Sequence, residues 1–477
     1  MEAVTRFLNS LKSTDRQLVY EFVILLDHDE DVAAKAAVAT WLLAQNPQFR
    51  PLLTELQAVE RLVRATVQHP RSAELQSAAC GTLKLLCVGP HEGAAETKRR
   101  LTFELDAIGV ATTALRGHAN DAEVQREALG LLRALASSAP RGARLVLDAG
   151  GVALCLESLK SHLSDEAVGE AVCGVLKALR CAPKGTAAAA NQGGSSALAV
   201  VEAVVTTRLQ DECETGLKFC EDLLALPSSS GGDVASRTAS QTILGLITIF
   251  LEGKGVQGRG IRLIPAISQR LRRFSGHLRI QTLGCQIFIQ LTTGGMAQEE
   301  AAARIAKTDC LTRVCQAMRD LPCNMHLQQL GLEVLLNVVK VNNEHKTAGF
   351  KAGGIAVTIT AMRSYSKNIK IQELGINCLL HLSDTVGRSA NCAKLGGLDL
   401  VVSALARHMK QGRVAELALM LLCMFCDDSR LRQHVLVSGA LASARPLCRS
   451  SHSRAAQHWA AELLKEFAAD CPVVLQS

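Results

Sequence analysis

The five-residue stretch IQELG at residues 371–375 recurs along this 477-residue chain with little change. The same pattern, an aliphatic residue followed by Gln, any residue, Leu and Gly, appears as IQTLG at 280–284 and as LQQLG at 327–331. The three copies start 47 and 44 residues apart. Self-similarity at a period of about 20–50 residues is typical of arrays built from one repeated structural unit.

Looser copies extend the pattern in both directions. VQREA at 124–128 and LQSAA at 75–79 keep the Gln and place Ala where Gly stood. VAAKA at 32–36 and VAELA at 414–418 lose the Gln but keep the small residue, and AQHWA at 456–460 resembles a terminal copy. The repeat therefore covers nearly the whole chain.

Each copy opens an apolar stripe with helical spacing. After Ile371, apolar residues follow at offsets of 3, 7, 8 and 11, and the same offsets after Ile280 are also apolar. This spacing indicates an amphipathic helix and not a strand. The small residue inside the stripe suits the close approach of another helix backbone, because it has little or no side chain.

A second signal, a pair of glycines, precedes another apolar helix. It occurs as GGV at 150–152, GGI at 353–355 and GGL at 396–398, and SGA at 438–440 follows at the next interval of 43 residues. Glycine at such a position allows a sharp turn between two helices.

The units at residues 124–159, 327–362 and 371–406 resemble armadillo repeats, and the resemblance is clearest at residues 71–160 and 275–450. The resemblance implies an all-α, armadillo-type α-solenoid of about eight to nine three-helix repeats, wound into a right-handed superhelix with a concave groove. HEAT repeats have a similar period, but the Gly-Gly turn favours armadillo. Solenoids of this kind commonly bind other macromolecules.

The expected organisation has five parts. Residues 1–70 form an N-terminal cap and first repeat, residues 71–226 hold armadillo-like repeats, and residues 261–451 hold further repeats. Residues 452–477 form a C-terminal capping helix and tail. Between the two repeat blocks, residues 227–260 are rich in Gly and Ser, and they read either as a hinge or as an ordinary surface insertion.

The composition favours a cytoplasmic protein, with nuclear access left open. Hydrophobic residues make up 48% of the chain but aromatic residues only 3%, which suits closely packed helices. The 17 cysteines show no disulfide framework, which indicates a reducing compartment. The N-terminus has no apolar signal region, and the apolar run 243–251 is too short to span a bilayer.

Motifs that carry chemistry are few, and each has a simpler interpretation. GKGVQG at 253–258 matches a dinucleotide fingerprint but follows a predicted helix, so a loop is expected. CMFC at 423–426 has no partner pair to complete a zinc site, and HDED at 28–31 indicates a helix N-cap. We therefore expect no enzyme, no cofactor, no metal and no small-molecule substrate; a catalytic site built from scattered residues is the remaining alternative.

Armadillo proteins similar to importin-α hold extended peptides with Trp and Asn, six and ten residues after the first aliphatic position of the groove helices. At these offsets the present chain has no Trp, and Asn337 alone matches the Asn. A nuclear-import receptor for basic signals is therefore not expected. Three consecutive repeats nevertheless place polar residues at both offsets: Gln286, Gln290, Glu333, Asn337, Asn377 and His381.

We predict that these six residues, here called the polar ladder, line the groove and clamp the backbone of a partner protein. Amide side chains both donate and accept hydrogen bonds, as a peptide backbone requires. The predicted function is a scaffold or adaptor that binds an extended or acidic protein segment. Solvated helix faces without any partner are the plainer interpretation.

A basic patch lies just upstream of the polar ladder. It comprises six arginines: Arg259, Arg262, Arg270, Arg272, Arg273 and Arg279. It indicates an alternative function, a platform for nucleic acid or phospholipid, although a solvated face also explains it and no aromatic array accompanies it. The net charge of +7 over 477 residues is a mild excess for a nucleic-acid binder.

Overall fold

The computed structural model describes residues 16–89, 93–138, 140–180, 212–225, 233–252, 256–293, 297–449 and 453–467. Every regular element in these ranges is a helix, and none of them contains a strand. The chain divides into two compact units, Met1–Gly253 and Lys254–Ser477, called unit 1 and unit 2. The prediction of an all-α fold is therefore confirmed.

In unit 1, from residue 50 to residue 180, two shorter helices precede each longer one along the chain. Residues 212–225 are also helical. The helices of unit 1 are α2 (Arg16–Ile24), η1 (Leu25–Asp27), α3 (Glu30–Gln45), η2 (Pro47–Phe49), α4 (Arg50–Glu55), α5 (Ala58–Gln68), α6 (Ala73–Cys87), α7 (Ala94–Phe103), α8 (Ala107–Gly117), α9 (Ala122–Ala136), α10 (Pro140–Asp148), α11 (Gly151–Ser161), α12 (Glu166–Arg180) and α14 (Asp233–Leu251).

Unit 2 repeats one triplet of helices with little variation. Its helices are α15 (Gln257–Arg262), α16 (Ile264–Arg273), α17 (Leu278–Thr293), α18 (Gln298–Lys307), α19 (Cys310–Asp320), α20 (Met325–Val339), α21 (Asn343–Lys351), α22 (Gly354–Ser364), α23 (Ile369–Leu382), α24 (Val386–Lys394), α25 (Gly397–Arg407), α26 (Gly412–Phe425), α27 (Ser429–Val437), α28 (Ala440–Arg449) and α29 (Arg454–Glu466).

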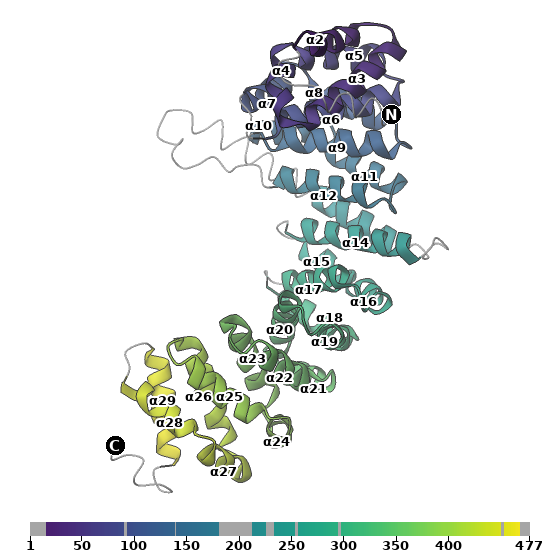
Figure 1. Ribbon diagram of the computed structural model, residues 1–477. Helices are drawn as coiled ribbons and strands as arrows, with labels where there is room; N and C mark the ends of the chain where they lie inside the picture. The colour runs from purple at the N-terminus through teal and green to yellow at the C-terminus, as the bar shows by residue number, and fades with distance from the viewer. Residues whose placement is uncertain are drawn as a thin grey trace, which may run out of the picture. The chain divides into compact units, whose positions relative to one another are not determined.

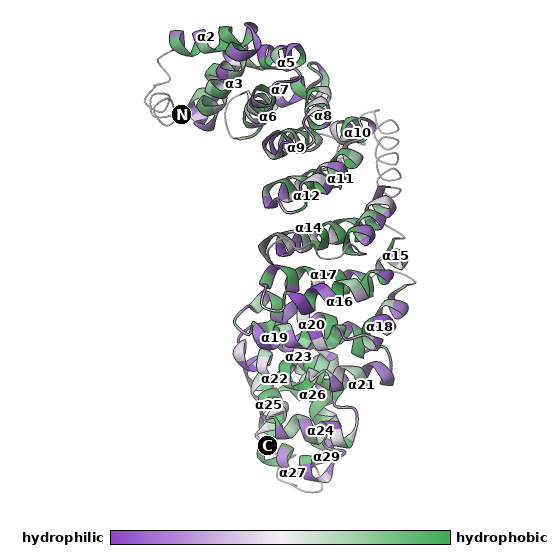
Figure 2. Cartoon of the chain, turned by 90° about the vertical axis from the view of Figure 1, so that its right-hand side faces the viewer, coloured by the Kyte–Doolittle hydropathy of each residue, from purple (hydrophilic) through white to green (hydrophobic). Residues whose placement is uncertain are grey.

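The third helix of each triplet packs against the third helix of the next. In unit 2 this row runs α17, α20, α23, α26 and α29, and each member contacts the one that follows. Figure 1 shows α20, α23, α26 and α29 in one row, and the first helices α21, α24 and α27 in another. In Figure 2 single helices carry both hydrophobic and hydrophilic residues, as expected of helices buried on one side.

The predicted glycine turns lie between the first and second helices. Gly150, Gly353, Gly396 and Gly439 have φ angles of 79°, 84°, 81° and 83°, in the left-handed region that residues with a Cβ rarely adopt. In unit 1 two residues other than glycine take the corresponding position, Gln57 with φ 58° and Asp106 with φ 46°. The glycine pair therefore marks the turn in most repeats but not in all.

The recurring Gln has a structural role that the sequence pattern did not reveal. In five copies its side chain is buried, and its Nε2 donates to two backbone carbonyls at the end of the preceding second helix. For Gln328 the acceptors are the carbonyls of Met318 and Leu321, at 2.9 and 3.1 Å. Since the last carbonyls of a helix lack partners within it, this Gln ties the second helix to the third.

The small residue of the pattern faces a side chain and not a helix backbone, so that part of the prediction is wrong. A Cβ atom added at Gly284 would lie 2.5 Å from Cδ2 of Leu271, and one at Gly331 would lie 2.5 Å from Sδ of Met318. Both neighbours belong to the second helix of the same triplet. Glycine here makes room for an apolar side chain between the helices.

Neighbouring triplets are also joined by a hydrogen bond from the residue that follows the second helix. His162 Nε2 lies 2.8 Å from the carbonyl of Ala119, and His408 Nε2 lies 2.8 Å from the carbonyl of Ser366. At the same position Tyr365 donates its hydroxyl to the carbonyl of Pro322 at 3.0 Å. Each bond reaches a loop of the previous triplet, so it fixes the stacking of one repeat on the next.

Parts of the expected organisation fall outside the described residues. These are residues 1–15 of the predicted N-terminal cap, residues 181–211, residues 226–232 at the start of the predicted break, residues 253–255 of the glycine-rich GKGVQG segment, and the tail from residue 468. Within the predicted break at 227–260, α14 occupies residues 233–251 and α15 begins at Gln257, so the expected loop at 253–258 is wrong for its last two residues, which are helical. The HDED segment does hold a helix N-cap, because Asp29 accepts a hydrogen bond from the backbone N–H of Val32 at 3.2 Å.

Candidate protein-binding surface

The polar ladder lies on three neighbouring third helices of unit 2. Gln286 and Gln290 are on α17, Glu333 and Asn337 on α20, and Asn377 and His381 on α23. Helix α17 contacts α20, and α20 contacts α23. Since residues four apart share one face of a helix, each pair presents two polar groups on the same side of its helix.

Five of the six ladder residues are half-buried, and Asn337 is the exception at 6% exposure. The Asn337 amide is engaged at both ends: Nδ2 donates to Thr292 Oγ1 at 3.3 Å, and Oδ1 accepts from Lys340 Nζ at 3.1 Å. Thr292 belongs to α17, so Asn337 links two third helices. A partner would have to displace these bonds to use Asn337, whereas Gln286, Glu333, Asn377 and His381 are partly exposed. The Oε1 atom of Gln290 is buried, although the residue as a whole is half-buried.

His381 lies beside a charged network that joins α21, the loop after α23, and α24. Asp384 accepts from Lys346 at 3.0 Å and from Arg388 at 2.9 Å. Burial lowers the pKa of His381 below its ordinary value, and the nearby Lys346 adds to the effect while Asp384 opposes it. The imidazole is therefore held neutral, with one nitrogen able to donate and the other able to accept a hydrogen bond.

This pKa shift has a consequence for stability. Well above pH 6.5 the imidazole is neutral in both the folded and the unfolded chain. As the pH falls below 6.5, the unfolded chain binds the proton first, so folding stability is lost progressively down to the folded-state pKa. We expect the His381→Leu variant to lose less stability than the wild type between pH 7.5 and 5.5, measured as urea midpoints. An equal loss in both proteins would contradict the assignment.

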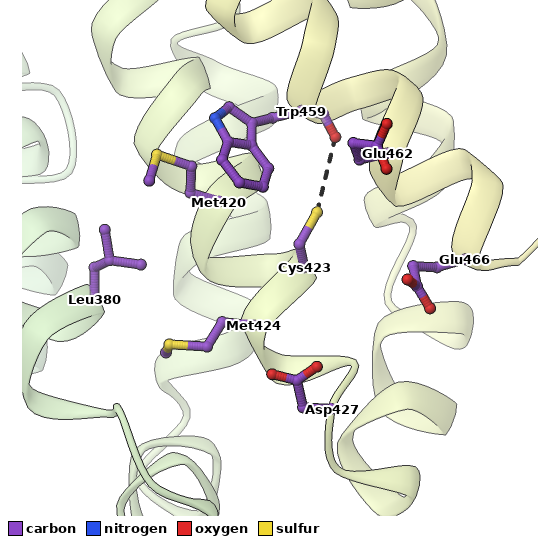
Figure 3. A pocket seen from close by; sticks show the side chains of 8 residues that line it. All are labelled: Leu380, Met420, Cys423, Met424, Asp427, Trp459, Glu462 and Glu466. Carbon is purple, nitrogen blue, oxygen red and sulfur yellow. Dashed lines mark hydrogen bonds between the residues drawn. The ribbon is translucent and has the colours of Figure 1, made fainter.

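The third-helix row ends in a pocket of about 390 Å³ between α23, α26 and α29. Figure 3 shows the side chains that line it. They are Leu380, Met420, Cys423, Met424, Asp427, Trp459, Glu462 and Glu466. Met420 with Met424, and Glu462 with Glu466, hold the same two offsets in their helices as the ladder residues do in theirs.

The prediction of site residues missed Glu462 and Glu466. The same offsets counted from Ala456, the first residue of the terminal AQHWA copy, reach both glutamates. The sequence therefore carries the same signal in the last repeat. Trp459 lies at the position where other copies hold Leu374 or Leu417, and it places an indole in the pocket wall.

Cys423 and Cys426 lie at the end of α26, as expected for packing residues. Burial raises the pKa of each thiol to about 12, so neither is a thiolate at neutral pH. Within the described ranges, no group of three or more His, Cys, Asp or Glu residues could hold a metal ion. No helix in those ranges is long and apolar enough to cross a membrane.

The basic patch is distributed over three helices that contact one another. Its members are Arg259 and Arg262 on α15, Arg270, Arg272 and Arg273 on α16, and Arg279 on α17. Burial, with the nearby Arg273, lowers the pKa of Arg270. The Arg273 guanidinium lies 5.4 Å from the centroid of the Phe274 ring. Part of the patch is thus engaged in packing.

The chain resembles a solved structure from work on a conserved phosphorylation switch that controls the interaction between cadherin and beta-catenin. The match has a TM-score of 0.63 at 14% identity and covers 94% of this chain and 83% of that chain. The fold is an armadillo-type α-solenoid. The crystal structure of an engineered protein is also similar, with a TM-score of 0.64 at 18% identity over 94% of this chain and 98% of that chain.

No protein-family profile matches the sequence, and no curated protein matches it by sequence. Identities of 14% and 18% establish the likeness of the armadillo-type fold alone. Function in such a fold depends on the particular residues displayed on it. Any functional conclusion must therefore rest on the polar ladder and the pocket.

Proposed function

We propose that this chain is a non-enzymatic scaffold that binds an extended segment of a partner protein across the third helices of unit 2. The observation that supports the proposal is the polar ladder, in which α17, α20 and α23 each carry polar side chains at the same two offsets. Most of these side chains are half-buried, so their conformations are restricted before a partner binds. Restricted polar groups lose less entropy on binding.

The spacing of the helices suits an extended polypeptide. Packed helices lie about 8–10 Å apart, and an extended chain advances about 3.3–3.6 Å per residue. A segment that crosses the third helices therefore passes one of them about every three residues. The ladder residues could then bond to backbone N–H and C=O groups at regular intervals, which is how side chains recognise a segment with limited dependence on its sequence.

The charges near His381 favour an acidic residue in the partner. Lys340, Lys346 and Arg388 surround this part of α23, whereas Asp384 supplies the negative charge of the same network. Three cations against one carboxylate leave a positive surplus. Oppositely charged groups on a partner would be drawn to it. The similar structure named above comes from work on a protein–protein interaction, which agrees with a protein partner.

The test of the polar ladder uses peptides selected by the full chain from a random library of displayed 16-residue segments. We expect the Gln286→Ala, Asn377→Ala, His381→Ala triple variant to bind the selected peptides about ten- to a hundredfold more weakly, because each lost hydrogen bond is worth about 0.5–1.5 kcal/mol. Asn337 is left unchanged, since its bond to Thr292 stabilises the fold. Fluorescence anisotropy of the labelled peptides measures the affinity.

The matched control replaces three exposed polar residues on other helices of unit 2. Gln269, Asn343 and Gln433 lie on α16, α21 and α27, outside the third-helix row. Their combined change to Ala is expected to leave the affinity unaltered. Equal affinities of the ladder variant and the wild type would overturn the proposal, as would a failure to select any peptide.

A further inference from the structure

The pocket between α23, α26 and α29 combines apolar walls with carboxylates. Leu380, Met420, Met424 and the indole of Trp459 provide the apolar part. The carboxylates of Asp427, Glu462 and Glu466 lie on another side of the same space, as Figure 3 shows. A pocket with an apolar body and a few polar groups is the usual form of a specific binding site.

The carboxylates are only partly neutralised by the protein itself. Glu466 pairs with Arg432 at 3.0 Å, and Glu462 pairs with Lys465 at 2.6 Å. The Lys465 side chain is 70% exposed, so its pair is screened by water and weak. Asp427 forms no ion pair with any residue that the structure describes. Three carboxylates against two cations leave the pocket with a negative surplus.

Cys423 lies at the pocket wall, and its pKa responds to the same excess of negative charge. Its Sγ lies 3.8 Å from the carbonyl oxygen of Trp459, to which it donates a hydrogen bond. Burial is the main cause of its raised pKa, and Glu466, Glu462 and Asp427 all raise that pKa further. The three carboxylates therefore act together on one point of the pocket.

We propose that this pocket takes the side chain of one arginine or lysine of the partner segment, an inference that rests on the proposed function. The aliphatic stem would pack against Met420, Met424 and Leu380, and the cation would reach Asp427 and Glu462. Both amino acids combine an apolar stem with a charged head, which matches the two kinds of lining. Trp459 also lines the pocket, and an indole ring attracts a cation that lies over its face.

Other occupants fit this lining less well. An acidic side chain would be repelled by the three carboxylates. An apolar side chain would displace water from the carboxylates without replacing the hydrogen bonds that this water makes. The negative charge of the pocket also contrasts with the positive charge near His381. His381 lies on α23, the helix next to α26. The third-helix row therefore fixes the order of charges in the partner, with the acidic residue toward α23 and the basic residue toward α29.

The test follows the peptides selected by the wild-type chain. They are expected to share a basic residue at one end. An arginine at that position is replaced by citrulline, which keeps the shape of the side chain but removes its charge. We expect about a tenfold loss of affinity for the wild type and no further loss for the Asp427→Asn, Glu462→Gln variant. The Glu299→Gln, Glu300→Gln variant, changed on exposed α18 residues, keeps the tenfold loss.

The two proposals fail in different ways. Peptides that need the polar ladder but show no shared basic residue would overturn this inference and leave the proposed function standing. The same holds if citrulline costs as much in the Asp427→Asn, Glu462→Gln variant as in the wild type. If no peptide binds, or if binding ignores the ladder, the proposed function fails and this inference fails with it. Thermal unfolding of each variant verifies that it is folded.

Discussion

The Gln328→Leu variant is expected to lower the free energy of unfolding of unit 2 by about 1–3 kcal/mol. The Gln328 side chain is 2% exposed, and its Nε2 donates to the carbonyls of Met318 and Leu321. Leucine fills a similar volume but cannot donate, so the Met318 carbonyl would lose this partner, whereas the Leu321 carbonyl keeps the N–H of Asn324 at 3.3 Å. Each buried unsatisfied group costs about 1–3 kcal/mol.

The neighbouring residue provides the control for that variant. Gln329 is half-buried, and Gln329→Leu makes the same chemical change without removing either of these bonds. Urea denaturation followed by circular dichroism gives the change in stability, and hydrogen exchange locates it in α19 and α20. Similar losses in the two variants would show that the bonds of Gln328 do not stabilise the junction of the second and third helices.

Lys84→Met is expected to destabilise unit 1 by about 3 kcal/mol, whereas Lys84→Met combined with Glu127→Leu restores most of the loss. Glu127 is a charged residue on α9 whose side chain is 5% exposed, and Lys84 on α6 pairs with it. Arg126 gives Glu127 a second partner at 3.1 Å. Removing Lys84 leaves a buried carboxylate with a weaker set of partners, which is unfavourable in a poorly hydrated site.

The sequence itself suggests the rescue. Glu127 stands where the clearest copies of the repeat hold Leu283, Leu330 and Leu374, so Glu127→Leu restores the usual residue. A double-mutant cycle measured by urea denaturation gives the coupling between the two side chains. If the double variant is less stable than Lys84→Met alone, apolar side chains cannot replace the Lys84–Glu127 pair, which contradicts the prediction.

The fold was predictable because the repeat leaves similar signals in most copies. The Gln-containing pattern located the third helices α17, α20 and α23, and the glycine pairs located the turns before α11, α22 and α25. The bonds of the Gln could not be predicted, because its acceptors lie seven and ten residues earlier on a different helix. Only the crossing of the two helices brings them together.

The turns at Gln57 and Asp106 show the limit of the glycine signal. Both residues adopt positive φ without the conformational freedom of glycine, and surrounding packing must hold them there. Asp106 gains a local compensation, since its side chain accepts a hydrogen bond from the backbone N–H of Gly109 at 3.2 Å. A search for glycine alone therefore passes over these two repeats.

The candidate site was predictable in its position but not in its detail. Counting offsets placed the ladder residues on three consecutive third helices, because helical periodicity is regular. Asn337 donates a hydrogen bond to Thr292, which lies 45 residues away in the previous repeat. Counting offsets within one repeat could not reveal this bond. The charges of Asp427, Glu462 and Glu466 gather only because α26 and α29 pack together.

Photo-crosslinking of a selected peptide tests the central claim most directly. A peptide that carries a photoreactive phenylalanine at successive positions is bound to the full chain, irradiated, and mapped by mass spectrometry. We predict crosslinks to residues of α17, α20, α23 and α26, in the order of the peptide positions. Crosslinks concentrated on the first helices α18, α21 and α24, or on unit 1, would contradict binding across the third helices of unit 2.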